Sequence, residues 1–114
     1  MNNRNILKMK RSNFVDYVVA EVSNHPAFDE ALGQNMNLRN KVISFGSKNP
    51  RNLDVWADDL KNITAHLRRL KSTGKVYVRG SDIKDLVYIR KLIREYKQSR
   101  SITGRIKSLF SRKK

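Results

Sequence analysis

The sequence predicts a small, mainly α-helical single domain with at most one short strand, at 75–79. Three observations favour this class. Two stretches place apolar residues at intervals of three and four, the spacing of one helix face. Turn-forming residues separate these stretches, and nothing else in the chain is a strong strand. The domain is therefore expected to be built around a long amphipathic helix at 53–72 and a basic helix at 81–98.

The long helix has the clearest pattern in the chain. Six apolar side chains fall on one of its faces, namely Leu53, Trp56, Leu60, Ile63, Leu67 and Leu70. Acidic residues (Asp54, Asp58, Asp59) stand in its first turns and basic residues in its last turn, which matches the helix dipole. Gly74 supplies the left-handed residue that commonly follows a helix end.

The basic helix is predicted to begin at Ser81 or Asp82, both of which are plausible N-caps. Its apolar stripe comprises Leu86, Ile89, Ile93 and Tyr96. A row of basic residues, Arg90, Arg94 and Lys97, follows one flank of that stripe at helical spacing. Because the stripe packs inward, this row is expected to lie exposed at the edge of the contact, where it can reach a polyanion.

The N-terminal half reads as a scaffold of short helices at 12–52, preceded by a basic arm at 1–11 that is mobile at its tip. A helix capped by Ser12 or Asn13 is expected to reach about Val22, although its valines also suit a strand. Two further short helices are expected: one opened by Pro26 and ended by Gly33, and one over Leu38–Phe45 ended by Gly46, with a loop at 46–52.

Segment 75–79 alternates apolar and polar residues, which is a strand pattern. A lone strand leaves backbone groups unpaired, so the segment is either an extended linker or a strand that pairs with a second copy in a homodimer. After Arg100, segment 101–114 is expected to form a basic amphipathic tail whose apolar side chains are Ile102, Ile106, Leu109 and Phe110.

Charge is the strongest global property of the chain, with 25 Lys and Arg against 10 Asp and Glu. Residues 1–60 hold 8 basic and 7 acidic side chains, a balance of +1, whereas residues 61–114 hold 17 and 3, a balance of +14. A one-sided excess of this kind favours nucleic acid or an anionic membrane as the partner.

The residue inventory argues against an enzyme, a cofactor or a metal site. The chain has no cysteine, and its two histidines, His25 and His66, have no second ligand at metal spacing in the sequence. The acidic residues near Asp54 are explained by their place at a helix start, and no glycine-rich phosphate loop occurs. We expect a non-enzymatic binding protein that lacks a cofactor.

We expect the basic C-terminal half to contact the phosphates of nucleic acid, with Tyr77 stacking on a base or touching a sugar. DNA is favoured over RNA because the aromatic motif of the RNA-recognition sheet is absent. The candidate binding residues are Arg68, Arg69, Lys71, Lys75, Tyr77, Arg79, Arg90, Lys91, Arg94, Lys97, Arg100, Arg105, Lys107 and Arg112.

Residues 75–112 resemble a ribbon-helix-helix DNA-binding unit, in which paired strands from two chains enter the major groove. The resemblance implies that Lys75, Tyr77 and Arg79 would face DNA. The intervening helix is longer than such units usually have, and Gly104 weakens the last helix. The string at 63–78 also looks like the recognition helix and wing of a winged helix. The unbroken apolar pattern before it argues against a turn there, so the chain is assigned to neither family.

Three alternatives stay open. The chain is an RNA-binding or particle-coating structural protein, a peripheral protein of anionic membranes that uses the tail at 102–114, or an adaptor for protein partners. The absence of an apolar stretch of membrane-spanning length favours a cytoplasmic protein, or one associated with a nucleoid or a virion. Repeated Asn, Lys and Ile are typical of AT-rich genomes such as those of many phages and plasmids.

Overall fold

The computed structural model describes residues 6–47 and 49–100. Its helices, in chain order, are α2 (Arg11–Ser23), the 3-10 helix η1 (Pro26–Phe28), α3 (Ala31–Gln34), α4 (Met36–Ser47), α5 (Leu53–Ser72) and α6 (Gly80–Arg100). The described ranges contain no strand. The predicted all-α fold class is confirmed, and 75–79 is an extended linker between α5 and α6.

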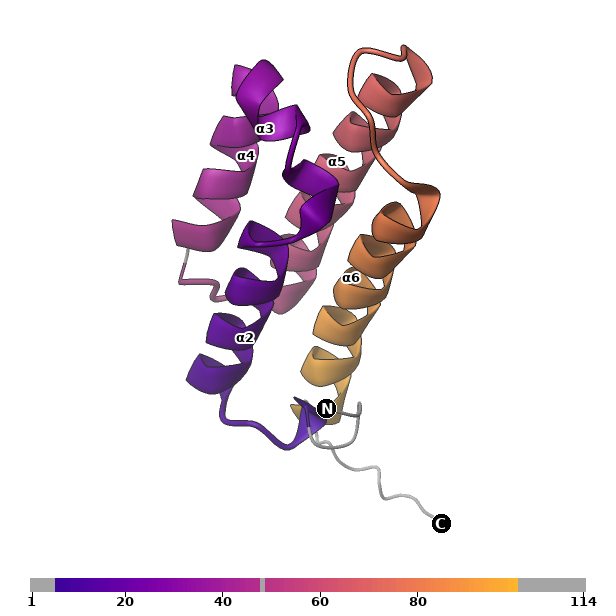
Figure 1. The fold of residues 1–114 in the computed structure, drawn as a ribbon. Helices are drawn as coiled ribbons and strands as arrows, with labels where there is room; N and C mark the ends of the chain where they lie inside the picture. Colours follow the sequence, from indigo (N-terminus) through magenta and orange to yellow (C-terminus); the bar gives the residue numbers. More distant parts are fainter. Residues whose placement is uncertain (1–5, 48, 101–114) are drawn as a thin grey trace.

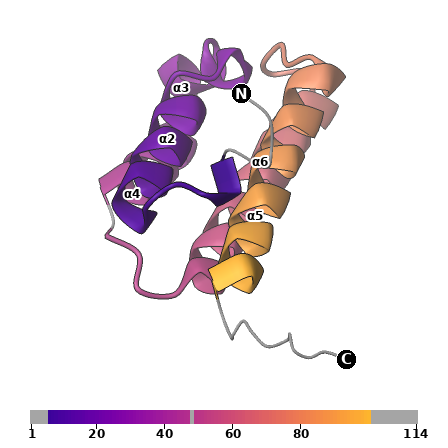
Figure 2. The same ribbon diagram turned by 90° about the horizontal axis from the view of Figure 1, so that it is seen from below.

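The four long helices α2, α4, α5 and α6 run in alternating directions and form an antiparallel bundle (Figure 1). Seen from below, α2 and α4 form one pair and α5 and α6 the other (Figure 2). The most extensive contact between two elements joins α5 to α6, which form a hairpin. Across the described residues, no helix combines the length and the apolar character that crossing a lipid bilayer requires.

The bounds of α5 agree with the prediction from its apolar stripe. Its N-cap is Asn52, whose side-chain oxygen accepts hydrogen bonds from the backbone N–H groups of Asp54 and Val55 at 2.9 and 3.2 Å. At the other end, Gly74 adopts a φ of 73°, and its N–H donates to the carbonyl of Lys71. The left-handed residue predicted after the helix is therefore confirmed.

The start of α6 differs from the prediction. The helix begins at Gly80, and the carbonyl of Arg79 accepts from the backbone N–H groups of Asp82 and Ile83. The carboxylate of Asp82 instead binds the guanidinium of its near neighbour Arg79, at 3.1 and 3.4 Å. The prediction of Ser81 or Asp82 as the cap is wrong because both residues lie inside the helix, which begins at Gly80.

The N-terminal helices were only partly predictable. α2 starts at Arg11, and its cap position, Lys10, makes no side-chain cap, so the predicted Ser12 or Asn13 cap is wrong. The helix expected after Pro26 is split into η1 and α3. α4 continues through Gly46, where an added Cβ would meet Val19 and Ser23 of α2 at 3.4 Å. Gly46 therefore permits a close helix contact and does not end the helix.

Two aromatic pairs fix the positions of the bundle helices. Phe45 of α4 and Trp56 of α5 stack with ring centroids 4.6 Å apart, and the indole N–H of Trp56 donates to the Phe45 carbonyl at 3.2 Å. Phe14 of α2 and Tyr96 of α6 stack with centroids 3.9 Å apart. These pairs connect α4 to α5 and α2 to α6.

The segment at 6–10 lies between α2 and α6 (Figure 2). Ile6 is buried in the core, and the carbonyl of Met9 accepts a hydrogen bond from the hydroxyl of Tyr96 at 2.5 Å. This part of the predicted basic arm therefore closes the side of the bundle where α2 and α6 meet.

Candidate nucleic-acid interface

The first group of predicted binding residues gathers at the closed end of the α5–α6 hairpin. Arg68, Arg69 and Lys71 occupy the last turns of α5 and are exposed. Lys75 and Tyr77 follow in the linker, and Tyr77 has 72% of its surface exposed. Between Lys61 and Ser81 the sequence contains six basic residues and no acidic residue. This end of the hairpin therefore presents positive charge beside an exposed aromatic ring.

The linker at 75–79 keeps the predicted alternation without forming a strand. Val76 and Val78 are buried, whereas Tyr77 points outward, and its N–H donates to the carboxylate of Glu30 at 3.3 Å. A side chain of the same subunit thus satisfies this backbone group. The described residues contain no ribbon for a ribbon-helix-helix unit, and α5 is unbroken where a winged helix needs a turn before Ile63.

Arg79 is less available than predicted because it is paired with Asp82. Its ion pair with Asp82 joins the guanidinium to a carboxylate that is almost fully buried. The hydrogen bond and the charge of Asp82 raise the pKa of Arg79 above its usual value, and Asp29 contributes to the same shift. Arg79, Asp29 and Glu30 line one hollow with Tyr77. This side of the linker is therefore locally acidic.

The second group of predicted residues lies along α6. Lys91 and Arg94 are exposed, whereas Arg90 is half-buried. The Nε atom of Arg90 is buried without a hydrogen-bond partner. Lys97 forms an ion pair with Asp54 of α5, with Nζ and Oδ2 2.5 Å apart. The predicted row is thus divided between cations that face solvent and one cation that connects the two helices.

Three predicted residues, Arg105, Lys107 and Arg112, lie outside the described residues, as does the predicted amphipathic tail. Arg100 is the last residue of α6.

The ion pair of Asp54 with Lys97 shows the register of the antiparallel hairpin. Lys61, seven residues after Asp54 on α5, is therefore level with Arg90, seven residues before Lys97 on α6. After another seven residues, Arg68 is level with the turn that carries Lys84. Lys61 and Lys84 are both exposed but were not among the predicted binding residues. Lys61 stands two helical turns before Arg68, and Lys84 stands two turns before Lys91. This spacing in the sequence would have identified both lysines.

We refer to the outward side of α5 and α6, together with the closed end of their hairpin, as the hairpin surface. Its basic residues are Lys61, Arg68, Arg69, Lys71, Lys75, Lys84, Arg90, Lys91 and Arg94. The same register places Asp58 of α5 near the level of Arg94, so acidic side chains accompany the open end of the hairpin. The strongest uncompensated charge therefore lies toward the linker.

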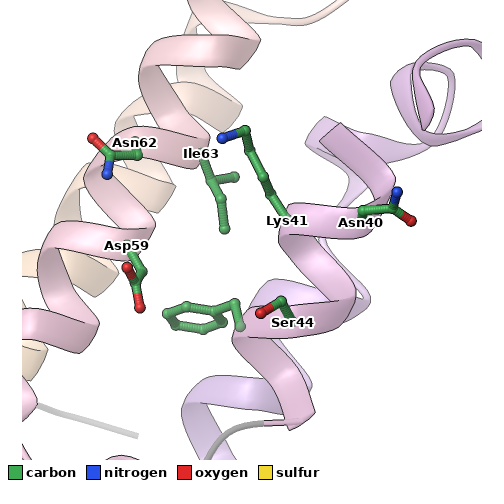
Figure 3. Close-up of a pocket in the computed structure, with 7 residues that line it drawn as sticks. Asn40, Lys41, Ser44, Asp59, Asn62 and Ile63 are labelled. Atoms are coloured by element: carbon green, nitrogen blue, oxygen red, sulfur yellow. The ribbon is translucent and has the colours of Figure 1, made fainter. Parts of the chain in front are cut away.

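A groove of about 270 Å³ separates α4 from α5 on another side of the molecule (Figure 3). Phe45 and Ile63 line its base. Lys41 extends from α4 across the groove toward α5, while Asp59 lies further along α5 toward its start. The remaining lining residues, Asn40, Ser44 and Asn62, are polar. The groove therefore offers hydrogen-bonding groups over an apolar base.

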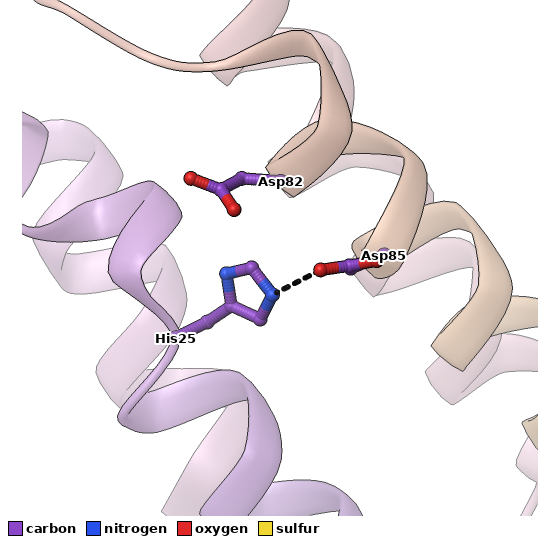
Figure 4. A group of neighbouring side chains, drawn as sticks. All are labelled: His25, Asp82 and Asp85. Carbon is purple, nitrogen blue, oxygen red and sulfur yellow. Dashed lines mark ion pairs between the residues drawn. The ribbon is translucent and has the colours of Figure 1, made fainter.

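His25, Asp82 and Asp85 form a cluster that the sequence did not reveal (Figure 4). No second ligand stands near His25 at metal spacing in the sequence, but the bundle brings two carboxylates of α6 to it. However, Nδ1 of His25 accepts the N–H of Ala27 at 3.0 Å, so the neutral ring carries its proton on Nε2. Nε2 faces Asp85 at 3.4 Å, and Asp82 is bound to Arg79.

Neither nitrogen of His25 thus has a free lone pair for a metal ion. The cluster is best explained as a polar contact that joins η1 to α6.

Comparisons of the chain with protein-family models, with curated proteins and with solved structures found no match.

Proposed function

We propose that this protein is a non-enzymatic nucleic-acid-binding protein whose hairpin surface contacts phosphate groups. The observation that carries the proposal is the buried, unpartnered Nε of Arg90, level with Lys61 across the hairpin. A buried donor without an acceptor is costly, and a phosphate oxygen would supply the missing acceptor. The run from Lys61 to Ser81, which contains no acidic residue, extends the positive surface from that point.

The dimensions of the hairpin suit a polyanion. α5 has 20 residues and therefore spans about 30 Å, close to one turn of duplex DNA. Lys61 and Arg90 lie near the middle of this length, while Arg68, Lys75 and Tyr77 mark the closed end. Phosphate contacts along the helices would position the strand, and the exposed Tyr77 ring would stack on a base or contact a sugar.

DNA is the favoured ligand, with RNA as the alternative that the test distinguishes. The hairpin surface is complete within one chain, so the proposal does not depend on a homodimer. A cytoplasmic or nucleoid-associated location and a regulatory, accessory or packaging role fit this binding mode. A role in a phage or plasmid system would fit it as well.

The test is fluorescence anisotropy of duplex DNA, single-stranded DNA and duplex RNA, each titrated with the intact protein at several salt concentrations. We expect binding that persists near physiological salt for one class of nucleic acid. The combined variant Arg68→Gln, Arg69→Gln and Lys71→Gln should make the dependence of log affinity on log salt less steep. The magnitude of the slope should fall by about 2 to 3, because each lost phosphate contact contributes about 0.9.

The matched control removes the same number of charges elsewhere, by Lys8→Gln, Arg39→Gln and Arg51→Gln, all at exposed positions. Its salt slope should stay close to that of the unmodified protein. Equal loss in both variants would mean that only net charge matters, which contradicts a defined hairpin surface. Weak binding to all three nucleic acids, combined with tight binding to anionic vesicles, would favour the membrane alternative.

A further inference from the structure

The groove between α4 and α5 becomes basic toward the end of α5. Lys41 of α4 reaches across the groove, and its ammonium lies beside the turn of Ile63 (Figure 3). No described residue forms an ion pair with Lys41 or a hydrogen bond to its side chain. α4 contains no acidic residue, so nothing on this helix balances the charge.

His66 stands one helical turn beyond Asn62 and Ile63, which line the groove. Its Nδ1 atom is buried and has no hydrogen-bond partner. Burial lowers the pKa of His66, and the positive charges of Arg69 and Lys41 lower it further. Cations from both helices therefore face the ring, and one ring nitrogen there lacks a partner.

Acidic groups do not offset this cluster. Arg69 follows His66 on the same helix after three residues and is exposed, and the charge of Lys41 on α4 also acts on His66. The acidic side chain of the groove, Asp59, lies two turns before His66 on α5, on the far side of Asn62. The end of the groove near His66 thus has two cations, Lys41 and Arg69, the imidazole of His66 and the amide of Asn62.

We propose that Lys41, His66 and Arg69 form a binding site for a phosphate group at this end of the groove. Lys41 would supply an ammonium, Arg69 a guanidinium, and the unpartnered Nδ1 of His66 an N–H donor. Because Nδ1 is directional while the two cations are flexible, His66 sets the position of the phosphate. The site is separate from the hairpin surface in all but Arg69, and it does not depend on nucleic-acid binding.

The site predicts that phosphate binding is coupled to protonation of the His66 imidazole. A bound phosphate stabilises the protonated imidazole, so phosphate raises the pKa of His66 toward its ordinary value. By the same linkage, phosphate affinity increases as the pH falls through that pKa. The groups that act on His66 are Lys41 from α4 and Arg69 from α5, both of which stay charged throughout this range.

The test follows the ring protons of both histidines by NMR while phosphate is added. The probes are inorganic phosphate, a 5′-mononucleotide, and a single-stranded oligonucleotide without terminal phosphates, each against sodium chloride at equal ionic strength. We expect a saturable shift of the His66 signals only. His25 is the internal control because its ring is engaged with Ala27 and Asp85 against α6.

Lys41→Gln should weaken inorganic phosphate binding about tenfold, the loss typical of one charge-assisted hydrogen bond. Arg39→Gln, an equal change of charge at an exposed position of the same helix, should alter it less than twofold. Responses to the small phosphates alone identify a free or terminal phosphate, and a response to the oligonucleotide identifies a backbone phosphate; both support the site.

The inference is overturned if His66 responds to phosphate only as it does to sodium chloride, or if the two variants weaken binding equally. These outcomes are independent of the proposed function. Oligonucleotide binding by anisotropy, combined with no change at His66 under any of the three phosphate probes, would overturn this site and leave the hairpin surface intact. A phosphate response at His66 without nucleic-acid binding would support this site and overturn the proposed hairpin surface.

Discussion

Lys97 and Asp54 form an ion pair across the open end of the α5–α6 hairpin, with 2.5 Å between Nζ and Oδ2. Both side chains are more than two-fifths exposed, so the pair is a surface interaction. It nevertheless shows which residues of the two helices are level with each other. It also partly neutralises a lysine that was predicted to bind the ligand.

Lys97→Gln should therefore have little effect on the stability of the protein or on its nucleic-acid affinity. We expect the free energy of unfolding to fall by less than about 1 kcal/mol, as for exposed ion pairs. Nucleic-acid affinity should fall less than it does for Arg94→Gln, which removes an equal charge from an exposed position. Urea denaturation and anisotropy measure the two effects. A larger affinity loss at Lys97 would show that the ligand competes with Asp54.

Tyr96→Phe isolates one hydrogen bond between α6 and the segment at 6–10. The variant keeps the stacking on Phe14 but loses the hydrogen bond from the Tyr96 hydroxyl to the Met9 carbonyl. The expected loss is about 1 to 2 kcal/mol. Urea denaturation followed through Trp56, the single tryptophan, measures it. An unchanged midpoint would mean that water replaces the hydroxyl.

Gly74→Ala tests the end of α5. The residue has a φ of 73°, which costs an alanine about 1 to 2 kcal/mol, although an added Cβ would meet nothing within 4 Å. Gly80→Ala is the matched control, since it is also free of neighbours and lies in a helix. Only Gly74→Ala should lower the melting temperature. Equal effects would argue against the left-handed conformation.

The stability of the protein should depend on His66 as the pH falls. Because burial and nearby cations lower the pKa of His66 in the folded state, the unfolded state binds more protons between the two pKa values. The stabilisation is present above about pH 6.5 and is lost as the pH falls. His66→Gln should therefore show a smaller decrease of melting temperature between about pH 7.5 and 5. An unchanged pH profile would contradict the lowered pKa.

The regular elements were predictable because their signal is local. The spacing of apolar residues from Leu53 to Leu70 set the bounds of α5, and the linker was one of two interpretations of 75–79. Caps were less predictable. Asp82 has the right chemistry for a cap but binds Arg79, and the real cap of α5 is Asn52.

The candidate sites depend on contacts between distant segments, which a single sequence does not show. Nothing near His25 in the chain indicates Asp85, which lies 60 residues away along the sequence and meets it only when η1 packs on α6. Lys41 and His66 likewise come from different helices. Charge patterning identified the basic half of the chain, but it did not reveal which cations already have acidic partners.

The contact between Met9 and Tyr96 has a consequence for the order of folding. Consecutive helices of the bundle pack on each other, and contacts of this local kind form rapidly. The hydroxyl of Tyr96, however, meets a carbonyl 87 residues earlier in the chain. During synthesis, Ile6 and Met9 leave the ribosome long before α6 exists, so their docking site is completed last. Residues that emerge before the rest of the bundle are thus among the last to find their native contacts.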